Sequence, residues 1–252
     1  PCRAASYGGQ REPSEWDRFA SNYYYNQMNG RQQEFYDQLD EEAYAYLSTW
    51  ETVNGYGSGT SNLIAAAGLS ETEAKEVYQI FRYANPQYYF ISNRYFVGRE
   101  GGTMYFAFDV YPAFVNGRER AHATKEFKSS VEGALEEVLA AGEEPEARAR
   151  AAHDWVARKV DYDQNYMDES IDFSEYEMTA YTQSAYSTFC RDVTVCAGYT
   201  LAYELLCNAA GIDSVSVTSE THAWNKVRLY GNWYQVDCTW DDLGILGAEV
   251  DV

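Results

Sequence analysis

Basic residues are scarce in this chain of 252 residues. Lysine and arginine together number 19, against 39 aspartate and glutamate residues, which gives a formal net charge of −20 at pH 7. Phosphate backbones and anionic lipid surfaces repel a protein with this charge, so nucleic acids and membrane surfaces are not expected partners. No apolar run approaches the roughly 20 residues that a helix needs to span a bilayer, so membrane insertion is not expected either.

Metal-binding patterns are also missing. The three histidines, His122, His153 and His222, are far apart in sequence, and no Cys-x-x-Cys pair occurs. Zinc sites are usually built on such short spacings, so neither a metal nor another cofactor is expected. The five cysteines are an odd number, which agrees with one free thiol and requires no disulfide.

A starting methionine and a signal-like hydrophobic region are absent as well, since the sequence begins Pro1-Cys2. We expect that any targeting segment has been removed or was never present. The 24 tyrosines favour an extracellular or cell-surface location, and a cytoplasmic location stays open.

The composition supports a folded protein, because 46% of the residues are hydrophobic. No internal repeat or low-complexity linker occurs, and a change of pattern divides the chain into residues 1–122 and 123–252. Periodic apolar residues, capping residues and glycine-rich breaks predict helices over residues 35–47, 70–85 and 127–141, a further helix from Pro145, and a strand hairpin over residues 88–97 and 103–111.

The segment that starts at Cys196 predicts a helix. Leu201, Leu205 and Leu206 recur at helical spacing after this cysteine, and Gly211 ends the pattern. Cys196 therefore belongs at a helix N-terminus, where unsatisfied N–H groups and the helix dipole favour the thiolate. This position predicts a pKa for Cys196 below the value of about 8.5 for a free cysteine.

His222 and Asp237 lie on two strand-like runs separated by Tyr230-Gly231. If these two residues form the turn of a hairpin, Leu229 faces Asn232, and His222 and Asp237 become diagonal neighbours about 7–8 Å apart at Cα. A three-residue loop would place the two side chains on opposite faces of the hairpin. The proximity of His222 and Asp237 therefore depends on the length of the turn.

A cysteine, a histidine and an aspartate that converge in this way suit acyl transfer. Cys196 would attack an amide or ester carbonyl, His222 would accept and return the proton, and Asp237 would orient the imidazole. The backbone N–H of Cys196 is one expected donor to the oxyanion, and Gln183 or Trp224 is the candidate for a second donor.

His153 is interpreted differently, as a structural or groove-wall residue. Its neighbour Asp154 is a carboxylate, but adjacent side chains on a helix point in different directions and are not expected to pair.

Three motifs resemble those of a known family. Residues 194–199 (TVCAGY), 222–225 (HAWN) and 233–242 (WYQVDCTWDD) are similar, in order and spacing, to the cysteine, histidine and aspartate motifs of bacterial transglutaminase-like proteins within the papain-like superfamily. The resemblance extends to residues 153–155 and 160–163.

This resemblance implies an α+β fold. Residues 123–252 would form a transglutaminase-like core, in which the helix bearing Cys196 packs on an antiparallel sheet bearing His222 and Asp237, and residues 1–122 would form an N-terminal accessory α/β region. It also implies a thiol-dependent amide hydrolase or acyltransferase, similar to a cysteine peptidase, that acts on a peptide, protein or cell-wall amide. A catalytically silent module that binds peptide or glycan is the alternative. The choice between hydrolysis and transamidation stays open, as does the oligomeric state.

Overall fold

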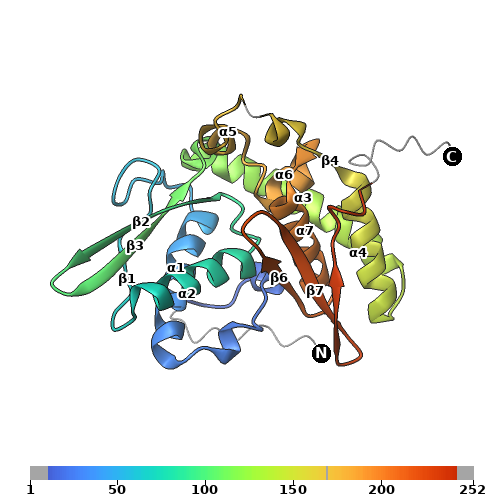
Figure 1. Ribbon diagram of the computed structural model, residues 1–252, viewed down its shortest axis with the longest axis horizontal. Coiled ribbons are helices and arrows are strands. Elements are labelled where there is room, and N and C mark those ends of the chain that lie inside the picture. Colours follow the sequence, from blue (N-terminus) through green and yellow to red (C-terminus); the bar gives the residue numbers. More distant parts are fainter. Residues whose placement is uncertain (1–10, 169, 243–252) are drawn as a thin grey trace. The chain divides into compact units, whose positions relative to one another are not determined.

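The computed structural model describes residues 11–168 and 170–242, which leaves Pro1 and Cys2 outside the described residues (Figure 1). Contacts between Cα atoms divide the chain into two units, Pro1–Lys125 and Glu126–Val252, and the division falls within helix α3 (Gly117–Ala140). Helices and antiparallel sheets are both present, which confirms the α+β class. The assignment of residues 1–122 to an accessory region stays a prediction.

The first unit combines two helices with a three-stranded sheet. Helix α1 (Gly30–Ser48) contacts α2 (Glu71–Ala84). The antiparallel sheet has the order β1 (Ile64–Ala65), β3 (Thr103–Val110) and β2 (Ile91–Glu100). Short 3₁₀ turns occur at Glu15–Phe19, Tyr25–Gln27 and Pro112–Phe114.

Two predictions for this unit can be compared with the structure. The capping box of α2 is confirmed, because Glu73 N–H donates to Ser70 Oγ at 3.2 Å and Ser70 N–H donates to Glu73 Oε2 at 2.9 Å. The strand hairpin is confirmed too, but β2 begins at Ile91 rather than at residue 88. Successive turns explain the later start, because Tyr88 N–H donates to the carbonyl of Asn85, and Ile91 N–H donates to that of Tyr88.

The second unit contains the segment with the three motifs. Its elements after α3 are α4 (Pro145–Lys159), β4 (Asp161–Tyr162), a 3₁₀ turn (Gln164–Met167), α5 (Phe173–Ala180), α6 (Ala185–Cys190), β5 (Val193–Thr194), α7 (Cys196–Ala209), β6 (Ser214–Thr218), β7 (Ala223–Leu229) and β8 (Asn232–Val236). Strands β4 and β5 form a parallel pair, and the other three form an antiparallel sheet in the order β6-β7-β8. Helix α7 contacts β6 and β7 as well as α4 and α6 (Figure 1).

Helix α7 lies at the centre of this unit. Leu205 and Leu206 are fully buried, as the helical spacing predicts. Glu204 on the same helix is also buried and accepts a hydrogen bond from the Ser216 hydroxyl on β6. Burial raises the pKa of Glu204 to about 8, so this side chain is mostly protonated at neutral pH and leaves no full charge in the core.

None of the helices within residues 11–168 and 170–242 is both long enough and apolar enough to cross a membrane.

The first turn of α7 approaches the preceding loop closely at Gly198. A Cβ atom at this position would lie 1.9 Å from Thr194 Oγ1 and 2.9 Å from the carbonyl oxygen of Thr182. The Thr194 hydroxyl cannot turn away without losing two hydrogen bonds, because it donates to the same Thr182 carbonyl at 2.9 Å and bonds to Ser187 Oγ at 2.6 Å. Glycine at 198 therefore permits the contact that fixes the start of α7.

We expect Gly198→Ala to destabilise the protein by about 1–3 kcal/mol, because the added methyl group must displace backbone or buried hydroxyl groups. Gly133→Ala is the matched control, since residue 133 is an exposed position of α3 with no atom within 4 Å of an added Cβ. That change should stabilise the helix by about 0.5–1 kcal/mol. Urea denaturation measures both, and equal free energies of unfolding for the two variants would contradict the close approach.

Candidate active site

The β7–β8 hairpin has the two-residue turn that the sequence predicts. Leu229 pairs with Asn232, which leaves Tyr230 and Gly231 as the turn residues. Their φ angles are 51° and 85°, and positive φ at both positions is characteristic of a type I′ turn. Tyr230 thus adopts a backbone conformation that glycine and asparagine adopt more readily. This two-residue turn sets the register in which β8 pairs with β7.

This register brings His222 and Asp237 together just beyond the paired ends of β7 and β8. His222 Nε2 lies 2.7 Å from Asp237 Oδ2, so the predicted pairing of these side chains is present. The other carboxylate oxygen, Oδ1, accepts the backbone N–H groups of Thr239 at 3.2 Å and Trp240 at 3.3 Å. Both oxygens of Asp237 are held, so the carboxylate is fixed toward the imidazole.

Two tryptophans flank the His222 ring. Trp224 stacks on it with ring centroids 5.8 Å apart and an interplanar angle of 17°, and Trp240 meets it edge-on at 5.9 Å and 70°. Trp240 itself is 63% exposed. The imidazole is therefore packed on two sides and keeps one orientation.

Cys196 is the first residue of α7, as predicted, and it is half-buried. Backbone N–H groups of Ala223 and Ala197 are directed at its thiol. Because Ala223 follows His222 directly, the thiol lies against the start of β7. The structure thus gathers Cys196, His222 and Asp237 around the ends of α7, β7 and β8.

The predicted lowering of the Cys196 pKa is wrong. Burial raises the pKa of the Cys196 thiol above its ordinary value, and the charge of Asp237 adds to this effect. The N–H groups of Ala223 and Ala197 act in the opposite direction but are outweighed. Placement at a helix N-terminus is visible in the sequence, whereas the loss of solvent around the sulfur depends on tertiary packing.

Gln183 and Trp224, the two candidates for a second oxyanion donor, each donate a side-chain hydrogen bond to another residue of the protein. Gln183 follows Thr182, whose carbonyl accepts the Val195 N–H at 3.2 Å, so this glutamine flanks the start of α7. Its Nε2 donates to the Tyr166 hydroxyl at 2.9 Å. Trp224 Nε1 donates to Gln235 Oε1 at 3.0 Å. A contribution of either side chain to an oxyanion hole stays a prediction.

Sequence reasoning missed two groups beside the site. Tyr162 on β4 pairs with Thr194 on β5, two residues before Cys196. Burial raises the pKa of Tyr162 to about 12, and a charge on Cys196 would raise it further. Strands of two residues carry no periodic signal, so only the motif at residues 160–163 pointed to this position.

The second missed group is a buried carboxyl. Glu177 of α5 is 1% exposed and accepts hydrogen bonds from the Thr182 hydroxyl at 2.8 Å, the Tyr166 hydroxyl at 2.7 Å and the Gln183 N–H at 3.1 Å. It thereby holds the loop that flanks Cys196.

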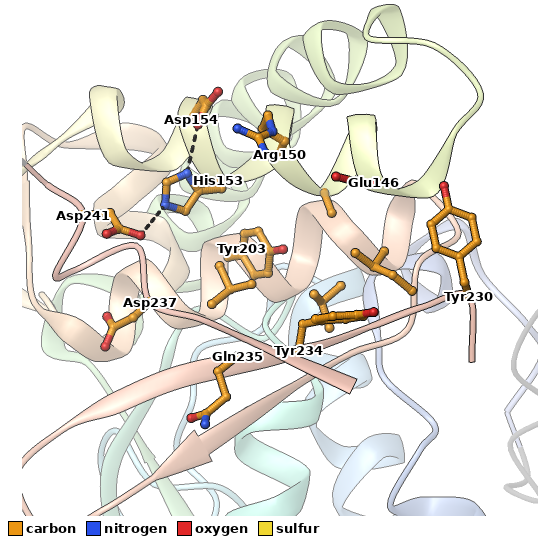
Figure 2. A pocket seen from close by; sticks show the side chains of 14 residues that line it. Glu146, Arg150, His153, Asp154, Tyr203, Tyr230, Tyr234, Gln235, Asp237 and Asp241 are labelled. Carbon is orange, nitrogen blue, oxygen red and sulfur yellow. Dashed lines mark hydrogen bonds and ion pairs between the residues drawn. The ribbon is translucent and has the colours of Figure 1, made fainter. Parts of the chain in front are cut away.

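His153 differs from its expectation in one respect. Its Nδ1 lies 2.9 Å from Asp154 Oδ1 and its Nε2 lies 3.0 Å from Asp241 Oδ2 (Figure 2). The prediction that adjacent helical side chains do not pair is wrong here, because Asp154 is exposed enough for its carboxylate to turn back toward the ring. His153 lines a cavity, which confirms its interpretation as a groove-wall residue.

The four cysteines in the described part of the chain, Cys190, Cys196, Cys207 and Cys238, are free thiols. Cys207 and Cys238 are buried, as expected for packing residues. Across residues 11–168 and 170–242, no three His, Cys, Asp or Glu side chains are grouped so that they could hold a metal ion.

Comparison with known proteins places these residues in a family. Residues 132–238 match the Transglutaminase-like superfamily. Kyphoscoliosis peptidases of Mus musculus and Homo sapiens are each 26% identical to this chain over 129 residues, which is 45% of this chain and 18% of each peptidase. The chain thus spans less than a fifth of the length of these curated relatives.

A crystal structure of a TGase is also similar, with a TM-score of 0.41, 14% identity, and coverage of 58% of this chain and 44% of that one. The matched segment contains Cys196, His222 and Asp237, so residues 132–238 form a transglutaminase-like domain.

Proposed function

We propose that the domain is a thiol-dependent enzyme that cleaves or transfers the acyl group of a peptide, protein or cell-wall amide. Cys196 is the nucleophile, His222 the general base and acid, and Asp237 the residue that orients the imidazole. The hydrogen bond between His222 and Asp237, at the end of the hairpin whose Ala223 N–H reaches the Cys196 thiol, carries this proposal.

The hydrogen bond of His222 determines which of its ring nitrogens can accept the thiol proton. Because His222 Nε2 is bonded to Asp237, Nδ1 is the ring nitrogen that takes the thiol proton as sulfur attacks the carbonyl. The backbone N–H of Cys196 stabilises the oxyanion. When the C–N bond breaks, the leaving amine receives the proton from the imidazolium. The Cys196 thioester is then hydrolysed by water or attacked by an amine.

One observation supports a second candidate, the silent binding module. Burial keeps Cys196 protonated, and an inert scaffold cysteine would look the same. The candidates differ in whether His222 deprotonates the thiol when substrate is present.

The first test supplies glutamine-containing peptides together with a labelled primary amine and measures products by mass spectrometry. A hollow in the surface is lined by His222 and Trp224, and Trp240 beside His222 is exposed. We therefore expect water to reach the thioester and the free acid to be the main product. Cys196→Ala should abolish product, whereas Cys190→Ala, which removes another half-buried thiol, should not. A dominant amine adduct would assign the domain as a transferase. Product from Cys196→Ala would remove the proposed nucleophile.

Asp237→Asn should lower kcat by about 10²–10⁴, because an amide stabilises the imidazolium poorly and favours the wrong tautomer. The fold should persist, since the asparagine oxygen can still accept the Thr239 and Trp240 N–H groups. Asp213→Asn is the control, as it removes the same charge from an exposed ion pair with Arg228. Steady-state kinetics and near-UV circular dichroism check both variants, and an unchanged kcat for Asp237→Asn would show that Asp237 does not orient His222.

Alkylation by iodoacetamide reports the state of the thiol. Since burial raises the pKa of Cys196, the thiolate fraction and the alkylation rate should keep rising with pH from 6 to 9, without a plateau near neutrality. Cys196 should still react before Cys190, whose pKa burial raises to about 12, and before the fully buried Cys207 and Cys238. Peptide mapping measures each rate. A plateau below pH 7 would instead indicate a preformed ion pair with His222.

A further inference from the structure

A cavity of about 520 Å³ lies between α4 and the β7–β8 hairpin (Figure 2). Its lining includes Ala149 of α4, Tyr203 of α7 and Val227 of β7, all of which are buried. The size is within the usual range of ligand sites. This apolar lining suits the aliphatic part of a side chain.

The cavity adjoins the candidate active site. A second hollow of about 420 Å³ lies over His222 and Trp224. The two hollows share four residues, which are Gln235, Val236, Asp237 and Asp241. A chain bound in the larger cavity therefore lies next to Asp237 and close to the His222–Asp237 pair.

Negative charge predominates around the cavity. Glu146 and Asp154 come from α4, and Asp237 and Asp241 from the segment at the end of β8. His153 lies between two of these carboxylates, and Arg150 is the remaining basic residue in the lining. Together with the net charge of −20, this favours a cationic ligand.

Exposed aromatic rings complete the lining. Tyr230 is 64% exposed and Tyr234 is 50% exposed, and both line the cavity. Aromatic faces accept the cationic head or the methylene stem of a lysine or arginine.

The backbone of β8 offers a second mode of contact. Within the described residues β8 is an edge strand of its sheet, and its pairing with β7 starts at Leu229 and Asn232. In an antiparallel ladder closed by a two-residue turn, alternate residues bond to the partner strand, so Gln235 directs its N–H and C=O away from β7. Gln235 lines the cavity although its side chain points away from α4 (Figure 2). An extended peptide pairs with such an edge.

We propose that this cavity is a subsite for an extended peptide segment that carries a lysine or arginine. The peptide backbone pairs with Gln235, the aliphatic stem packs over Tyr230 and Tyr234, and the cationic head lies near Glu146 or Asp154. The inference rests on the proposed function, since it assigns the segment to the substrate of Cys196.

Binding is tested in the full chain with Cys196→Ala, so that no turnover occurs. The probe is a fluorescent, acetylated and amidated peptide with two lysines, compared with the same peptide carrying glutamine at both positions. We expect the lysine peptide to bind about tenfold more tightly by fluorescence anisotropy at low salt, with the difference reduced at high salt. Equal affinities for the two peptides would overturn the proposal.

Variants that change the charge of single residues on α4 and α3 test whether the peptide binds in this cavity. Glu146→Gln should weaken binding of the lysine peptide by about twofold to fivefold, and Arg150→Gln should strengthen it by a similar factor. Glu136→Gln, which makes the same charge change on the exposed face of α3, should leave the affinity unchanged. An effect of Glu136→Gln equal to that of Glu146→Gln would mean that the overall charge, and not the cavity, attracts the peptide.

The outcomes separate this proposal from the proposed function. Tight, Glu146-dependent binding by a protein whose unsubstituted form neither hydrolyses nor transfers any peptide would support the subsite and overturn the catalytic role of Cys196. Turnover that depends on Cys196, with no preference for lysine in either turnover or binding, would overturn the subsite and leave the catalytic proposal intact.

Discussion

The register of the β7–β8 hairpin determines whether His222 and Asp237 can meet. Successive side chains of a strand alternate between faces, so a shift of one residue would carry Asp237 to the side opposite His222. The register is set at the far end of the hairpin, where Tyr230 and Gly231 both have positive φ. The hydrogen bond at the site thus depends on a backbone conformation several residues away from any reacting atom.

The position of Cys196 depends on a different kind of contact. The loop before α7 is held by hydroxyl and carbonyl groups of Thr182, Ser187 and Thr194, and Gly198 allows α7 to approach them. Glu177 holds the same loop from α5 through the Thr182 hydroxyl and the Gln183 N–H. These buried polar contacts are mutually dependent, since removal of one partner leaves the others unsatisfied. The hairpin and this polar cluster together position the three proposed catalytic side chains.

Local sequence signals predicted the parts of the site that depend on neighbouring residues. The helix start at Cys196 follows from apolar spacing, and the proximity of His222 to Asp237 follows from a two-residue turn. Features that depend on distant residues were not predictable in the same way. The contact of His153 with Asp241 joins residues 88 positions apart, and the raised pKa of Cys196 reflects what surrounds the sulfur.

Short elements were missed for another reason. Strands β4 and β5 have two residues each, which is too few for a period-two pattern, so the place of Tyr162 beside Thr194 appears only in the structure. The clash at Gly198 is equally invisible in the sequence, because glycine within a helix pattern gives no sign of what it faces.

The raised pKa of Cys196 also affects its durability. Peroxides oxidise the thiolate far faster than the thiol, and the first product, a sulfenic acid, leads on to sulfinic and sulfonic acids that thiols cannot reduce. Burial keeps the resting sulfur protonated, so the proposed nucleophile is shielded from oxidants when no substrate is bound. A nucleophile deprotonated only when a substrate engages the imidazole would survive an oxidising environment without a partner disulfide or a reducing cofactor.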